Sequence, residues 1–198
     1  MNKRLVKILL VCALFTAACA DKNGPAAGGG IFSSDETADA GNLVDEVNRN
    51  YLKLIKQRFN DNEPRLEELQ AALKSKNPEK VKTLCDQLID EINAGTRMGQ
   101  EAIDKLRVAR DKNINQDYKD YLDLKVTSLQ KYIDAFEERR QAAILLRDAY
   151  DPKNAAKRDQ TIALFKEREE KFKLIVDEAR RTSEQANRLA RESLNRKK

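Results

Sequence analysis

The stretch "NPEKVKTLCDQLIDEINAGTRMGQEAIDKLRVAR", residues 77–110, decides the fold class. Its apolar residues recur at steps of three and four, which is the period of an α-helix with one buried face. They are Val81, Leu84, Leu88, Ile92, Met98, Ala102, Ile103, Leu106 and Ala109. Asn77 can cap the helix, and Pro78 suits the first helical position because its missing N–H needs no partner there. The stretch therefore predicts one long amphipathic helix.

The same period continues on both sides of this helix. We expect three further helical blocks, at about 42–75, 115–149 and 152–198. Pro64 should kink or break the first block, because a proline inside a helix cannot donate the interior hydrogen bond. Asp151 and Pro152 are expected to cap and open the last block. No run alternates in the manner of a strand, so the predicted class is all-α.

Short connections between long helices make sequence neighbours antiparallel. We therefore expect residues 42–198 to form one domain, an up-down bundle of about four long amphipathic helices with apolar stripes facing inward. The alternative is an extended coiled-coil rod, since charge lies on several sides of each block.

Three features inside the blocks have structural interpretations. Cys85 lies on the apolar stripe of its helix and is expected to be a small buried core residue. Gly99, one turn after Gly95, indicates a close approach of a neighbouring helix or a local weak point. Tyr118 and Tyr121 are three residues apart, an arrangement typical of the core and its rim.

The first eighteen residues have the layout of a secretory signal. Basic residues at Lys3, Arg4 and Lys7 precede an uncharged apolar run over residues 8–18, and small residues follow. Eleven apolar residues are too few to span a bilayer, which needs about 20. We expect residues 1–18 to be a signal peptide and the mature protein to be exported.

The end of this signal, Thr16-Ala17-Ala18-Cys19, resembles a bacterial lipobox. The resemblance implies that Cys19 is lipidated and becomes the first residue of a lipoprotein anchored to the cell envelope. Because Ala20 and not an aspartate follows Cys19, it implies the outer membrane if the cell has two. The same residues allow an alternative interpretation. Ordinary signal cleavage at an A-x-A site ending at Ala20 would release a soluble secreted or periplasmic protein.

Residues 19–41 are rich in Gly, Ala, Ser and Asp and show no apolar periodicity. Such a composition predicts a flexible linker between the lipidated cysteine and the folded domain.

Catalytic motifs are missing from the sequence. It contains no histidine, which excludes Cys-His pairs and the Glu-x-x-His ligands of di-iron bundles. Carboxylate pairs such as Glu67-Glu68, Glu137-Glu138 and Glu169-Glu170 are interpreted as solvated surface. We therefore expect a protein that is not an enzyme and needs no cofactor, metal or small-molecule substrate. The leading hypothesis is a protein-binding or scaffolding module of the envelope.

The distribution of charge supports an alternative hypothesis. Residues 153–198 hold 14 basic and 8 acidic residues, whereas residues 21–152 hold 21 and 25. The basic excess favours contact with an anionic envelope component, such as lipid head groups or a cell-wall polymer, through the last helix. Nucleic acid is disfavoured because the protein is exported. The candidate contacts are Arg180, Arg181, Arg188, Arg191 and Lys198.

Overall fold

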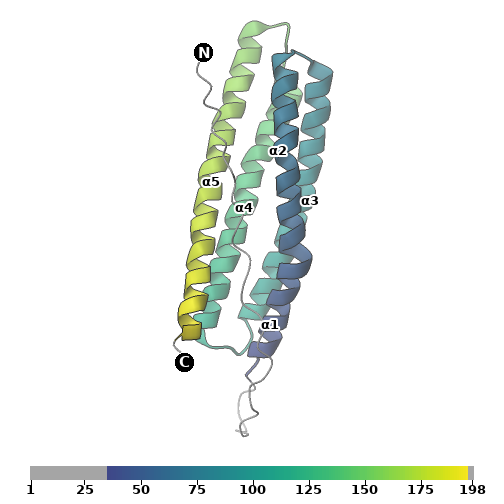
Figure 1. The fold of residues 1–198 in the computed structure, drawn as a ribbon. Helices are drawn as coiled ribbons and strands as arrows, with labels where there is room; N and C mark the ends of the chain where they lie inside the picture. The colour runs from purple at the N-terminus through teal and green to yellow at the C-terminus, as the bar shows by residue number, and fades with distance from the viewer. Residues whose placement is uncertain (1–34, 196–198) are drawn as a thin grey trace. The chain divides into compact units, whose positions relative to one another are not determined.

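The structure is a computed structural model that describes residues 35–195, except for the side chains of residues 59–61 and 193–195. It consists of α1 (Thr37–Glu46), a π-helical segment η1 (Val47–Leu52), α2 (Lys53–Lys74), α3 (Pro78–Arg110), α4 (Gln116–Ala149) and α5 (Ala155–Asn195). Residues 35–195 include no strand. The predicted all-α helical bundle is confirmed (Figure 1).

Side-chain caps fix where two of the long helices begin. Asn77 accepts a hydrogen bond from the backbone N–H of Lys80 (3.0 Å), as the sequence predicts. Asn115 accepts one from the N–H of Tyr118 (2.9 Å) and opens α4 in the same way. Each bond satisfies one of the donors that a helix start leaves without an intrahelical partner.

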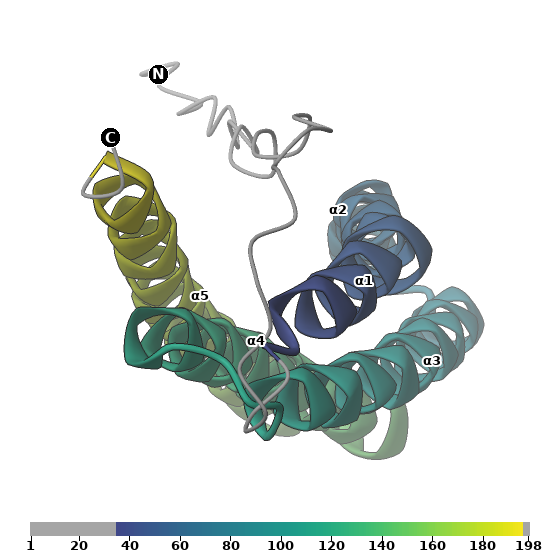
Figure 2. The ribbon, with the colours of Figure 1, turned by 90° about the horizontal axis from the view of Figure 1, so that it is seen from below.

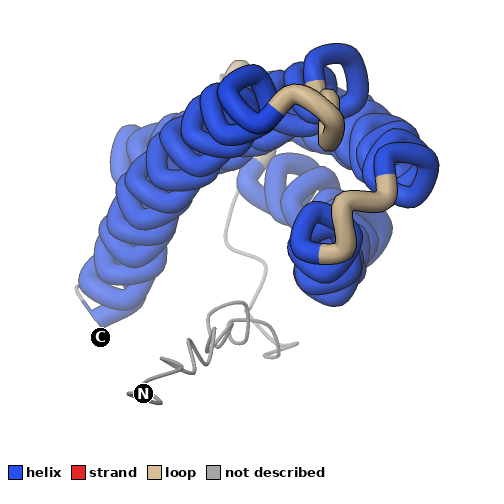
Figure 3. Tube along the Cα trace, turned by 90° about the horizontal axis from the view of Figure 1, so that it is seen from above, coloured by secondary structure: helices blue, strands red, loops and turns tan. Residues whose placement is uncertain are grey.

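The continuous run of α1, η1 and α2 packs beside α3 in the opposite direction, and α3, α4 and α5 follow in the same antiparallel manner. On α3, Lys105 pairs with Glu46 at 2.9 Å, and the later Lys112 pairs with the earlier Glu36 at 3.0 Å. Backbone contacts join α1, η1 and α2 to α3, α3 to α4, and α4 to α5. In the described region, α4 is the only helix whose backbone lies within contact distance of the α5 backbone. Figures 2 and 3 show α2 and α5 at opposite ends of this row of helices.

The buried core changes composition along the helices. Where the α2–α3 and α4–α5 turns lie, side chains from α2, α3, α4 and α5 meet, including Leu69, Leu88, Leu146 and Phe165. Towards the other end, α1, η1, α3 and α4 form a cluster without α5. Between them, Ile92, Ala135, Phe136 and Phe172 join α3, α4 and α5. The C-terminal half of α5 therefore shares less of the core than its first half.

The first helix begins five residues before the predicted boundary at residue 42. Asp35 accepts hydrogen bonds from the backbone N–H (2.9 Å) and the hydroxyl of Thr37. Ala40 is fully buried in the first turn of α1. The apolar residues of this turn are all small, so the periodicity of large side chains does not reveal it. The prediction that residues 37–41 belong to the linker is wrong.

The predicted irregularity at Pro64 is displaced towards the N-terminus. No break occurs there, because α2 runs without interruption through the proline. The departure from α-helical hydrogen bonding lies at η1 instead. Next to Pro64, the buried side-chain amide of Asn62 donates to the carbonyl oxygen of Arg58 (2.9 Å) and to Glu91 Oε2 on α3 (3.2 Å). These bonds hold the proline-containing turn against its neighbour.

The predicted start of the last helix at Asp151 and Pro152 is wrong by three residues. Asp151 Oδ1 accepts from the backbone N–H of Lys153 (3.0 Å) and so stabilises the turn between α4 and α5. The cap of α5 is Asn154, which accepts from the N–H of Lys157 (3.1 Å). Asp-Pro is a common turn opening as well as a helix start, and here the turn forms.

Three of the interpretations made inside the helices are confirmed. Cys85 is fully buried, and burial raises the pKa of its thiol to about 12. A Cβ atom at Gly99 would lie 3.0 Å from Ile133 Cδ1, so this glycine permits a close approach of α4 to α3. The rings of Tyr118 and Tyr121, both partly buried, stack with centroids 5.8 Å apart at the edge of the core.

Candidate interaction surface

Four of the predicted contact residues lie together on the surface of α5. Arg180, Arg181, Arg188 and Arg191 are all exposed. At about 100° per residue, they fall within an arc of about 100° around the helix. We call these four residues the arginine face. Arg180 pairs with Asp177 at 2.9 Å, so one of the four cations is partly neutralised.

The other predicted site residues are not described by the structure. Cys19, the signal peptide of residues 1–18, the linker up to residue 34 and Lys198 all lie outside the described residues. Their roles stay predictions from the sequence.

Two small buried residues help determine which side of α5 is exposed to solvent. Ala179 and Ala186 are buried and lie on the side of α5 away from the arginine face. The hydroxyl of Ser128 on α4 donates to the carbonyl oxygen of Ala179 (2.8 Å). Nearby, Lys131 Nζ of α4 lies 2.6 Å from Glu178 Oε2. These contacts fix the rotation of α5 on α4, and the arginine face is left to solvent.

Two leucines of α5 are also exposed. Leu164 is 42% exposed and Leu174 is 66% exposed, the largest value among the exposed large apolar residues of the described region. Both fall outside the stripe formed by Phe165, Phe172 and Ala179, so the helical period places them on the surface. The signal for these two residues in the sequence is their phase on the helix relative to the apolar stripe, and they were not among the predicted site residues.

A buried ion pair joins α4 to α5 where the sequence predicted solvated surface. Arg139 is 3% exposed. Its Nε lies 3.1 Å from Glu169 Oε1 and its Nη2 lies 2.9 Å from Glu169 Oε2. Such a two-point contact is a strong form of charge-assisted hydrogen bond. Glu169 is therefore a structural partner, and its interpretation as one of a solvated carboxylate pair is wrong.

The remaining contacts of Arg139 satisfy its guanidinium group. Its Nη1 donates to Glu63 Oε1 on α2 (3.2 Å), and its Cζ lies 3.6 Å from the centre of the Phe172 ring. Phe136 packs edge-on against Phe172 with ring centres 5.1 Å apart. All three guanidinium nitrogens bond to carboxylates of this chain, which makes the cluster a structural junction of α2, α4 and α5.

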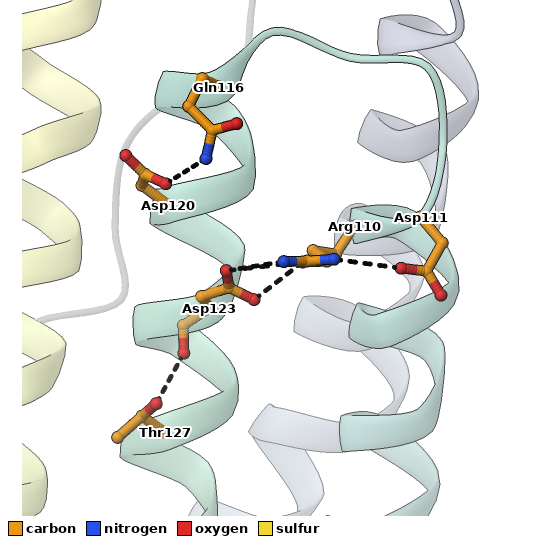
Figure 4. A network of polar contacts seen from close by, with 6 residues as sticks. All are labelled: Arg110, Asp111, Gln116, Asp120, Asp123 and Thr127. Carbon is orange, nitrogen blue, oxygen red and sulfur yellow. Dashed lines mark hydrogen bonds and ion pairs between the residues drawn. The ribbon is translucent and has the colours of Figure 1, made fainter.

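The turn between α3 and α4 carries an exposed polar network (Figure 4). Arg110 Nε donates to Asp123 Oδ1 (3.1 Å), and Gln116 Nε2 donates to Asp120 Oδ1 (2.6 Å). Glu36, which precedes α1, bonds to the same turn. The backbone N–H of Asn113 and the ammonium of Lys112 hold the pKa of Glu36 below its ordinary value. These contacts tie the start of the folded part to the α3–α4 turn.

One lysine on α4 has a shifted protonation equilibrium. Burial lowers the pKa of Lys125 to about 8. Its Nζ lies 5.5 Å from the centre of the Tyr121 ring. The amine therefore has a partly apolar environment beside an aromatic face, which is compatible with structural packing.

Searches for other kinds of site and for relatives give no match. Within residues 35–195, no group of three metal-ligating side chains is placed to hold an ion. No helix in that range has the length and apolar character needed to cross a membrane. No family model, curated protein or solved structure matches the chain.

Proposed function

We propose that this chain is a lipid-anchored, non-catalytic binding module of a bacterial envelope, in which α5 offers the surface for a partner protein. The lipobox-like signal ending at Cys19 supports the anchor. The observation that carries the binding role is the incomplete packing of α5. A helix of a four-helix bundle ordinarily packs against two neighbours, whereas α5 approaches the backbone of α4 alone.

The exposed leucines of α5 support a protein partner. Leu174 and Leu164 stand among charged side chains. Interfaces with proteins combine apolar contacts with a polar rim, and the outward side of α5 offers both. A partner helix could extend the row of helices beyond α5 and bury these side chains.

The anchor predicts the mass of the mature protein. We expect protein isolated from its native membrane to begin at Cys19 and to carry acyl chains. Intact-mass measurement of wild-type protein and of Cys19→Ser decides this, because the variant should lose the lipid mass. An unmodified wild-type species beginning at Asp21 would contradict the anchor.

The binding role predicts where a crosslink forms. A photo-reactive amino acid at Leu174 should crosslink one envelope protein in intact cells. The same amino acid at Val108, which is 54% exposed on α3, serves as the matched control. A crosslinked band that is specific to position 174 is the expected result. Equal patterns at both positions, or none at position 174, would count against α5 as the binding surface.

A second candidate function is binding of an anionic envelope component. The observation that favours it is the arginine face, because four exposed guanidinium groups share one side of α5. The two candidates differ in their response to salt. Attraction between exposed charges weakens as salt is added, whereas apolar contacts do not.

A further inference from the structure

The folded part begins at the same end of the bundle as the α3–α4 turn. The backbone N–H of Glu36 donates to the carbonyl oxygen of Asn113 (3.1 Å), and Glu36 Oε1 lies 3.0 Å from Lys112 Nζ. These two contacts join residues more than 70 positions apart in the chain. The segment that leads back to Cys19 therefore leaves the described structure at this end.

The arginine face lies at this end as well. Because α5 runs antiparallel to α4, its last turns lie beside the first turns of α4. The contacts of Ser128 with Ala179 and of Lys131 with Glu178 set this alignment. Arg188 and Arg191 follow these positions towards the α3–α4 turn. Figure 1 shows α1 and the C-terminal end of α5 at the same end of the helices.

The greatest possible length of the segment between Cys19 and residue 35 can be compared with the length of the bundle. Residues 20–34 span at most about 50 Å when fully extended. The helix α3, with 33 residues, is itself about 50 Å long at 1.5 Å per residue. Because residue 35 and the arginine face lie at the same end, the α2–α3 and α4–α5 turns lie about one helix length further along the bundle from residue 35.

The chemistry of the arginine face matches phosphate. A guanidinium group binds a phosphate through two parallel hydrogen bonds, which a lysine ammonium group cannot do. Among residues 180–192, four arginines stand against two acids, Glu184 and Glu192. A surface of anionic phospholipids presents such phosphates, whereas a protein partner of the arginine face would need acidic groups of its own.

We infer that the arginine face contacts the anionic phospholipid head groups of the same membrane that holds the lipid on Cys19. This inference rests on the proposed lipid anchor and adds a second attachment point to it. A basic patch adds to the attachment that an acyl anchor gives. Two attachment points would also fix one end of the bundle to the membrane.

The first experiment separates the arginine face from the anchor. The unlipidated mature chain with Cys19→Ser is sedimented with vesicles of phosphatidylcholine, with or without about 30% phosphatidylglycerol. Each cation near such a surface changes partition by about fivefold, so binding to the anionic vesicles should exceed binding to the neutral ones by at least tenfold. Added salt should remove the difference.

Matched variants test the location of the contact. The variant R180Q/R181Q/R188Q/R191Q should lose at least tenfold in binding to anionic vesicles. The control removes four exposed lysines at the opposite end of the bundle, namely Lys74, Lys76, Lys80 and Lys153, each replaced by Gln. Equal losses in the two variants would overturn the inference, as would equal binding of the parent chain to neutral and anionic vesicles. Circular dichroism confirms that each variant is folded.

The second experiment uses the lipidated protein. A fluorescent label on Gln185→Cys, beside the arginine face, should be quenched by a head-group quencher in anionic vesicles and not in neutral ones. Binding to isolated cell wall without quenching on vesicles would overturn the phospholipid contact. Failure of the lipid anchor is recognised separately, from the mass of the native protein, and leaves the sedimentation result of the unlipidated chain valid.

Discussion

Replacing Arg139 by alanine is expected to lower the free energy of unfolding by about 3–5 kcal/mol. The side chain of Glu169 is 14% exposed. Among the described ion pairs, Arg139 is its only partner. Removing the guanidinium leaves this carboxylate desolvated without a counterion and removes the cation from the Phe172 ring. Urea unfolding followed by circular dichroism measures the loss.

Arg140→Ala is the matched control for Arg139→Ala. Arg140 is the next residue on α4 and pairs with Glu137, one turn earlier, at 2.7 Å. Both of these side chains are partly or largely exposed, so the control should lose no more than about 1 kcal/mol. Losses of similar size in the two variants would show that burial of the Arg139 pair does not determine its contribution.

A double variant separates lost charge from lost packing. Arg139→Met keeps much of the side-chain volume but leaves Glu169 unpaired. Adding Glu169→Leu removes the buried charge, so the double variant should be more stable than Arg139→Met alone. If the second substitution lowers stability further, the stranded carboxylate is not the cause of the loss.

The helices themselves follow closely from local sequence patterns. The predicted limits of α3 agree with the structure because its cap, proline and apolar period all indicate the same boundaries. The first turn of α1 was not predicted because Ala40 is small and because Asp35, which accepts from the backbone N–H of Thr37, lies outside any periodic stripe. Local patterns thus locate helices with large apolar residues better than helices that bury small ones.

The Arg139 junction could not be predicted in the same way. Arg139 lies on the buried side of α4, in phase with Phe136, Ala143 and Leu146, yet a charged residue there resembles an interruption of the stripe. Its partners Glu169 and Glu63 are 30 and 76 positions away. Only the arrangement of three helices shows that one guanidinium group satisfies carboxylates on two of them.

The arginine face was predictable in part. Its residues and their basic excess are visible in the sequence, and the helical period places them on one side of α5. The end of the bundle at which they lie depends on the pairing of Glu36 with Lys112 and of Lys131 with Glu178. Because these contacts join distant parts of the chain, the relation between the arginine face and the start of the folded part required the structure.

Leu146→Ala should destabilise the fold by about 2–5 kcal/mol. Leu146 is fully buried in the cluster to which α2, α3, α4 and α5 all contribute. Shortening it removes buried apolar surface and leaves a cavity that helices packed on several sides cannot readily close. The matched control is Leu174→Ala, since Leu174 is 66% exposed and its loss should change stability by no more than about 0.5 kcal/mol. Both variants are unfolded in urea, with the slope of the transition compared to confirm that the same cooperative unit unfolds. A loss below 1 kcal/mol for Leu146→Ala would mean that α5 and α2 move inward to fill the cavity, and that this end of the bundle is less tightly packed than its buried side chains indicate.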